Sequence, residues 1–300
     1  MSQVRIAFHA GELGEKQARA VAAEVSRFVR EAEMVLIPVE RADPAVPSSV
    51  VMPPIQAAVL EGRADMAVLS LHDLGIVFAE GLKLAAVTQR VDARDAAVTA
   101  TQMPLRAMPE ATQVVVDSRR REAQVPLVRA DLQPVMLALP PEALLDSVAQ
   151  GNDQSGILAL ADLKWMGREE SAAEILAIED MLPAPGQGAL AILTREGDQS
   201  FEKAALAVHH RPTWACVRAE RGLVSALGAG GDLPISALAQ IAQDGAMVLH
   251  AAVFPPGGDP IRVDGTGKAE QPAELVQKVA EALKSAGADA ALAGARLRAT

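Results

Sequence analysis

Several residue types are scarce in this chain, and each scarcity excludes a class of protein. Tyrosine is absent and aromatic residues make up only 2 % of the 300 residues. The cores must therefore be built from small aliphatic side chains, which suits parallel sheets covered by helices. The single cysteine, Cys216, cannot form an internal disulfide, so nothing requires an oxidising compartment. Residues 1–5 lack the apolar run of a signal peptide, and no run reaches the ~18 residues of a membrane span. We therefore expect a cytoplasmic protein.

The charge balance is acidic. The formal net charge is -10, which argues against nucleic acid as the main partner. We expect neither a nucleic-acid nor a membrane partner. Half of the residues are hydrophobic, which is enough to bury sizeable cores, and the length favours more than one domain.

The hydrophobic pattern alternates between short apolar runs and segments of helical spacing. The expected strands are residues 4–8, 34–38, 66–69, 96–100, 113–116, 135–138, 157–160 and 175–178. The helices expected among them include residues 15–30, 55–61 and 119–127. This alternation predicts α/β layers with mostly parallel sheets.

The last third of the chain has a different pattern. A Pro/Gly cluster at residues 182–188 marks a crossing or a hinge of the chain. A helix over 213–227, a hairpin of strands 235–241 and 247–253, and a helix over 272–285 are expected beyond it. These elements predict a small α+β unit.

Six blocks, in chain order, resemble one family. The sharpest is Leu-Pro-Ala-Pro-Gly-Gln-Gly-Ala-Leu at residues 182–190. The others are residues 81–87 with 94–96, 62–74, 118–124, 161–167, and 210–213 with 219–221. Together they resemble the porphobilinogen deaminase (hydroxymethylbilane synthase) family over about residues 4–290.

The resemblance implies a three-domain fold. Two α/β domains of the type II periplasmic-binding-protein kind would flank a cleft, with a small α+β domain at the C-terminus. Residues 1–93 and 189–209 would form domain 1, residues 94–188 domain 2, and residues 213–300 the C-terminal domain.

The resemblance also implies a chemistry. Family members join four porphobilinogen units head to tail and release ammonia at each step. The carboxylates of the growing chain need Arg or Lys partners. An Asp beside the pyrrole nitrogens stabilises positive charge and helps to move protons. A thioether-linked dipyrromethane cofactor primes the chain, which requires a thiolate.

Some family positions are kept in this sequence. Asp73 matches the catalytic aspartate, within Ser-Leu-His-Asp-Leu at residues 70–74. Ser118, Arg120 and Arg121 match the block that binds substrate carboxylates. We expect Asp73 to be catalytic and the other three to bind substrate.

Other family positions have changed. The family's Arg in the first glycine turn aligns with His9, and the Lys before the catalytic Asp aligns with His72. Further family cations align with apolar residues at 138–140, 144 and 165. We expect His9 and His72 to bind an acidic ligand as hydrogen-bond donors.

The family's cofactor cysteine aligns with Gly231. Glycine carries no sulfur, and Cys216 lies about 16 Å away along the predicted helix, so a small slip in alignment does not bring it to this position. The sequence therefore predicts that the chain has no dipyrromethane cofactor. A metal site of His9, His72 and Asp73 is a weaker alternative, and we expect none.

Four functions remain open from the sequence, and the weakest of them is an enzyme with new chemistry at His9, His72 and Asp73. The first is a diverged member without normal synthase activity that binds an acidic small molecule, such as porphobilinogen or an oligopyrrole. The second is an active synthase with a non-covalent primer, and the third is a scaffold for a pathway protein. The sequence does not decide the ligand, the remaining catalysis, the oligomeric state, or whether the organism has a second copy with the cysteine.

Overall fold

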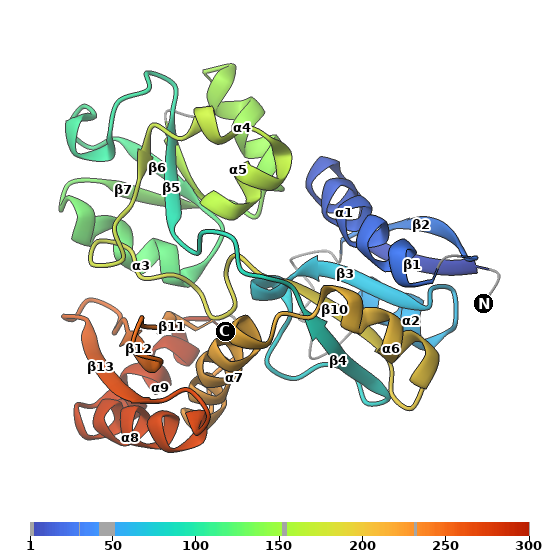
Figure 1. Ribbon diagram of the computed structural model, residues 1–300. Helices are drawn as coiled ribbons and strands as arrows, with labels where there is room; N and C mark the ends of the chain where they lie inside the picture. The colour runs from blue at the N-terminus through green and yellow to red at the C-terminus, as the bar shows by residue number, and fades with distance from the viewer. Residues whose placement is uncertain (1–2, 30, 42–51, 152–154, 231–232, 300) are drawn as a thin grey trace. The chain divides into compact units, whose positions relative to one another are not determined.

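The computed structural model describes residues 3–29, 31–41, 52–151, 155–230 and 233–299 (Figure 1). The chain forms two compact units. The first consists of Met1–Val91 and Ala189–Trp214, and the second of Asp92–Gly188 and Ala215–Thr300. No helix among the described residues is long and apolar enough to cross a membrane.

The first unit contains a five-stranded sheet in the order β2-β1-β3-β10-β4. Its strands are β1 (Gln3–His9), β2 (Glu33–Val39), β3 (Met66–Ser70), β4 (Leu82–Val87) and β10 (Leu190–Arg195). Its helical segments are α1 (Glu12–Phe28), α2 (Pro54–Leu60), α6 (Gln199–Ala205) and the 3₁₀ turns Leu71–Asp73 and Leu206–Val208. β1 runs parallel to β2 and β3, whereas β10 is antiparallel to β3 and β4.

The apolar pattern explains these elements. All five residues of β3 are buried, as a strand inside a helix-covered sheet requires. In α1, Ala18, Val21 and Val25 are buried at helical spacing, so one face of the helix packs on the sheet. Gly14 permits the close approach at its start, because an added Cβ there would collide with the carbonyl oxygen of His9.

The second unit contains a sheet with an equivalent order, β7-β6-β8-β5-β9. Its strands are β5 (Asp95–Thr99), β6 (Gln113–Val116), β7 (Gln133–Met136), β8 (Ser155–Ala159) and β9 (Glu174–Ile175). Its helical segments are α3 (Arg119–Val128), α4 (Pro141–Ala149), α5 (Leu160–Met166) and the 3₁₀ turns Leu105–Ala107 and Glu169–Ser171. Here β5 is the antiparallel strand, paired with β8 and β9.

The second unit also holds a three-stranded antiparallel sheet, β11-β12-β13. Its strands are β11 (Ile235–Ile241), β12 (Ala246–Val253) and β13 (Ile261–Lys268). The helices of this region are α7 (Arg211–Ala226), α8 (Pro272–Ser285) and α9 (Ala288–Ala299), and α8 packs on β12 and β13.

The predicted fold class is confirmed: two sheet-and-helix layers and a small C-terminal sheet with helices are present. β13 was not expected from the sequence. β9 spans only two residues, whereas a longer strand was expected at 175–178. The three-domain boundaries stay a prediction.

Candidate functional site

The first candidate site lies where three neighbouring parallel strands end. β1 ends at His9, β2 ends at Val39, two residues before Arg41, and β3 ends at Ser70, just before the 3₁₀ turn Leu71–Asp73. The order β2-β1-β3 brings the carboxyl ends of these strands to one edge of the sheet. Ligands bind at this edge in open α/β sheets.

The carboxylate of Asp73 has a nitrogen near each oxygen. Arg41 Nη1 donates a hydrogen bond to Asp73 Oδ2 at 3.4 Å, and His72 Nε2 lies 3.5 Å from Oδ1. The Asp73 side chain is 29 % exposed and that of Arg41 39 %. Both distances are long for charge-assisted hydrogen bonds, so the group stays accessible to a ligand.

Burial and neighbouring charges set the protonation states of Asp73 and His9. Burial disfavours ionised Asp73, but the charges of His72, Arg41 and His9 outweigh it and lower the pKa of Asp73. Burial and the charge of Arg41 lower the pKa of His9 to about 4, against the opposite effect of Asp73. At neutral pH, Asp73 is therefore ionised and His9 is uncharged.

Two imidazole nitrogens near Asp73 have no hydrogen-bond partner in the part of the chain that the structure describes. Nδ1 of His9 and Nδ1 of His72 are buried and make no hydrogen bond with the described residues. Buried polar atoms are normally satisfied, so two such atoms around one carboxylate favour a polar ligand here. We call His9, Arg41, His72 and Asp73 the Asp73 cluster. Within the described ranges, no group of three or more His, Cys, Asp or Glu residues is placed to hold a metal ion.

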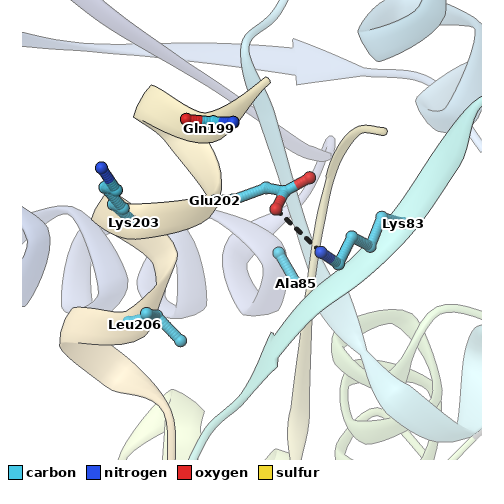
Figure 2. Close-up of a pocket in the computed structure, with 6 residues that line it drawn as sticks. All are labelled: Lys83, Ala85, Gln199, Glu202, Lys203 and Leu206. Atoms are coloured by element: carbon cyan, nitrogen blue, oxygen red, sulfur yellow. Dashed lines mark hydrogen bonds and ion pairs between the residues drawn. The ribbon is translucent and has the colours of Figure 1, made fainter. Parts of the chain in front are cut away.

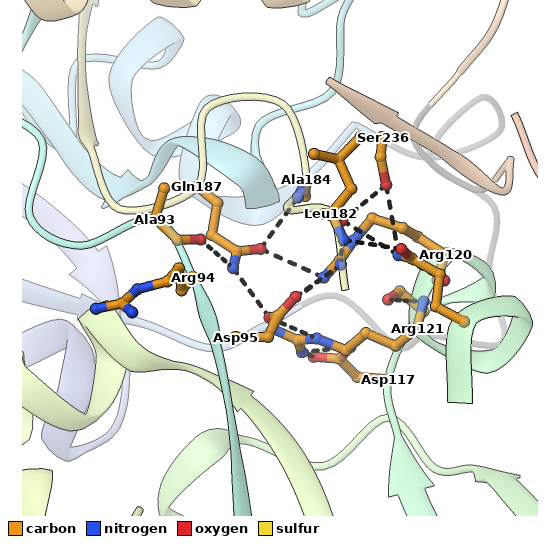
Figure 3. A network of polar contacts seen from close by, with 12 residues as sticks. Ala93, Arg94, Asp95, Asp117, Arg120, Arg121, Leu182, Ala184, Gln187 and Ser236 are labelled. Carbon is orange, nitrogen blue, oxygen red and sulfur yellow. Dashed lines mark hydrogen bonds and ion pairs between the residues drawn. The ribbon is translucent and has the colours of Figure 1, made fainter. Parts of the chain in front are cut away.

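The arginine pair forms a second cluster, in the other unit (Figure 3). Ser118 is the N-cap of α3 and accepts a hydrogen bond from the backbone N–H of Arg121. This cap places Arg120 and Arg121 in the first helical turn. Both side chains are almost fully buried, with 5 % and 3 % exposed.

Most N–H donors of Arg120 and Arg121 make hydrogen bonds within the second unit. Arg120 donates to Asp95 at 2.7 Å, to the Leu182 carbonyl at 2.9 Å and to Gln187 at 3.3 Å. Arg121 donates to Asp95 at 2.8 Å and to Asp117 at 2.7 Å. Burial disfavours ionised Asp95, but the two arginines outweigh it and lower its pKa. In this arrangement the pair joins β5, α3 and the 182–188 loop, and a role in substrate binding stays a prediction.

The 182–188 segment is held by side chains that lie in the blocks of family resemblance but to which the sequence analysis assigned no role. Gln124 donates to the Leu182 carbonyl and accepts from the Leu182 N–H. Glu220 accepts hydrogen bonds from the N–H groups of Gly186 and Ala239, each at 2.7 Å. Gln187 donates to Ala93 and to Asp95. These buried contacts give the most family-like segment of the chain a structural role.

Arg41 is the site residue that sequence reasoning missed. It has no counterpart in the blocks that carried the resemblance. Its place just after an expected strand, at residues 34–38, was a usable signal, because neighbouring parallel strands present their following residues at one edge. His9, His72 and Asp73 lie together as expected.

Two further features bear on the predictions. Cys216 is buried on α7, and Gly231 lies outside the described residues. A hollow of about 200 Å³ between β4 and α6 is lined partly by Lys83 and Glu202, which pair at 2.7 Å (Figure 2). These two charges neutralise each other.

Two family models match the chain, and both describe domains of porphobilinogen deaminase. Residues 4–203 match the family model described as "Porphobilinogen deaminase, dipyromethane cofactor binding domain". Residues 214–285 match "Porphobilinogen deaminase, C-terminal domain".

Curated relatives carry the same name. The chain is 37 % identical to the porphobilinogen deaminase of Thermus thermophilus, over 74 % of each chain. It is 34 % identical to that of Nitrosomonas europaea, over 80 % of this chain and 78 % of the relative.

A solved structure of the methionine-binding protein MetQ aligns with 69 % of this chain and 89 % of its own, at 12 % identity and a TM-score of 0.44.

The predicted absence of a cofactor is wrong. That prediction depended on one residue, Gly231, whereas the match to the cofactor binding domain extends over residues 4–203. The Asp73 cluster fits such a group, because a dipyrromethane presents pyrrole N–H donors and carboxylates. Asp73 is an ionised acceptor and Arg41 a partly exposed cation, and two imidazole nitrogens lack partners among the described residues. The chain belongs to the porphobilinogen deaminase family and is a hydroxymethylbilane synthase-like protein of tetrapyrrole biosynthesis.

Proposed function

We propose that this chain binds porphobilinogen through Asp73 and condenses it much more slowly than its relatives do. The observation that carries the proposal is the ionised, accessible Asp73 carboxylate at the ends of β1, β2 and β3. Charged acceptors make the stronger hydrogen bonds, and the substrate offers a pyrrole N–H.

The Asp73 cluster supplies the polar steps of the reaction. Asp73 accepts the pyrrole N–H and stabilises the positive charge that develops on the ring when ammonia leaves. It then accepts the proton released from the attacked pyrrole carbon. His9 and His72 orient the bound group through their Nδ1 atoms, which have no partners among the described residues. When bound, a dipyrromethane would supply the primer to which units are added, and Asp73 and Arg41 would hold it.

The slow turnover follows from a shortage of available cations. With a pKa of about 4, His9 brings no positive charge at neutral pH. Arg120 and Arg121 are buried against Asp95 and Asp117. The growing oligopyrrole gains carboxylates with every porphobilinogen that is added. Each addition therefore finds fewer unpaired cationic side chains in this protein.

The first experiment separates binding from turnover. The purified protein and the Thermus thermophilus relative are incubated with porphobilinogen under identical conditions. Product is followed by uroporphyrin absorbance, and binding by calorimetry. We expect measurable binding with product formed at least about a hundredfold more slowly, which corresponds to roughly 3 kcal/mol in the barrier. Product at the rate of the relative would contradict slow turnover, and absence of binding would contradict the whole proposal.

A matched pair of variants tests the role of Asp73. Asp73→Asn removes the charge and should weaken porphobilinogen binding about tenfold or more. The control is Asp198→Asn, since Asp198 is 27 % exposed and also pairs with an arginine, Arg195, in the same unit. The control should bind like the wild type. Equal affinity of both variants would remove Asp73 from the site.

A further inference from the structure

Arg41 is an accessible arginine whose hydrogen-bonding capacity is mostly unused within the described residues. Its guanidinium offers five N–H donors, and its recorded contact is one bond of 3.4 Å, from Nη1 to Asp73. Arg5, in the same unit, differs: it donates to Asp65 at 2.6 Å and to the Gly62 carbonyl at 2.7 Å. As far as the described residues are concerned, Arg41 therefore keeps an edge of its planar group available to a ligand.

The charges near Asp73 make Arg41 distinctive. The groups whose charge acts on Asp73 are His72, Arg41 and His9. His9 is uncharged at neutral pH because burial lowers its pKa to about 4. An arginine remains protonated at every physiological pH. Arg41 thus supplies the permanent positive charge of the Asp73 cluster.

We propose that Arg41 is a specificity-determining residue, whose free guanidinium edge binds a carboxylate side arm of the pyrrole substrate beside Asp73. The inference rests on the proposed function, because it requires a pyrrole on Asp73. A ring held there by its N–H carries acetate and propionate arms, and a cation next to Asp73 is placed to meet one of them. The planar fork of arginine suits a carboxylate in a bidentate geometry.

The test compares two probes that differ in the two acidic side arms. Porphobilinogen carries both acidic arms, and 2-(aminomethyl)pyrrole has the same ring and amine without them. Calorimetry measures both probes on the wild type and on Arg41→Gln, Arg41→Lys and Arg63→Gln. Arg63 is a matched control, because it is exposed and pairs with Glu61 in the same unit.

We expect Arg41→Gln to weaken porphobilinogen about tenfold or more and to leave 2-(aminomethyl)pyrrole almost unchanged. Arg41→Lys should recover part of the loss, and Arg63→Gln should match the wild type. In Arg41→Gln, the acid limit of porphobilinogen binding should also move to higher pH. Asp73 loses a stabilising positive charge there, while His72 and His9 remain near it.

Each other outcome has a definite meaning. An equal loss for both probes would overturn the carboxylate contact, since Arg41 would then act only through Asp73. Unchanged porphobilinogen affinity in Arg41→Gln, with a wild type that binds, would overturn the inference and leave the proposed function intact. A wild type that binds neither probe would overturn both. Thermal unfolding of each variant shows whether it is folded.

Discussion

Burial decides the charge of His9 at the end of β1. Desolvation and the nearby Arg41 lower its pKa from 6.5 to about 4, although Asp73 acts in the opposite direction. Between these pH values the unfolded chain binds a proton that the folded protein does not take up. Stability therefore falls as the pH drops from 6.5 toward 4, because the unfolded state binds more protons there.

A glutamine at this position should remove that linkage. Between pH 7 and pH 4, we expect the free energy of unfolding of His9→Gln to fall by about 3 kcal/mol less than that of the wild type. Urea unfolding at each pH measures this, followed by Trp214 in a Trp165→Phe background, because Trp214 belongs to the same unit as His9. The comparison at pH 7 isolates the cost of the substitution itself. Parallel losses in both proteins would show that His9 titrates alike in the folded and unfolded chains.

The residue types of the site were easier to predict from the sequence than their partners. Asp73 and the arginine pair lie in recognisable blocks. That Arg120 and Arg121 would bury their charge against Asp95 was not predictable locally, because Asp95 lies 25 and 26 positions away in the chain. Arg41 was missed for the same reason: its contact with Asp73 spans 32 positions and depends on the sheet order.

Among the elements, β13 shows why a strand can escape prediction. Its sequence, Ile-Arg-Val-Asp-Gly-Thr-Gly-Lys, contains two glycines, an aspartate and a lysine, which are depleted in strands and weaken the strand signal. The glycines are required by packing. A Cβ on Gly265 would lie 2.5 Å from Val279 Cγ2, and one on Gly267 would lie 3.1 Å from Leu275 Cβ. Helix α8 can therefore approach β13 only where the strand lacks side chains.

Alanine substitutions at two glycines should have opposite effects on stability. Gly265→Ala introduces a clash beneath α8 and should destabilise the fold by about 1–3 kcal/mol. Gly294→Ala, in α9, meets nothing within 4 Å and should stabilise it by up to about 1 kcal/mol through helix propensity. Thermal unfolding measures both. Val279→Ala should relieve the clash when it is combined with Gly265→Ala. Equal stability of Gly265→Ala and Gly294→Ala would contradict this account of the packing.

At the scale of the whole molecule, the two α/β sheets share one topology. Each has one antiparallel strand between two other strands: β10 lies between β3 and β4, and β5 between β8 and β9. The Pro/Gly cluster predicted a crossing near 182–188, just before β10. The resemblance assigned residues 189–209 to the first domain, but the place of β10 between β3 and β4 was not predictable, because strand order has no local sequence signal.

The inserted strand makes residues 1–91 dependent on residues 189–214. Without β10, β3 and β4 lose their shared partner, and the buried side chains on both faces of β10, including Ala191, Ile192 and Leu193, are missing from the core. Residues 1–91 alone should therefore remain largely unfolded by circular dichroism and hydrogen exchange. A chain that joins residue 91 to residue 189 through a short Gly/Ser linker should fold cooperatively, since Val87 already faces Ala191 across the antiparallel pair. The same fusion with Ile192→Asp serves as a control that should not fold. A folded 1–91 fragment would show that β10 is dispensable and that the first unit is held together by its parallel strands alone.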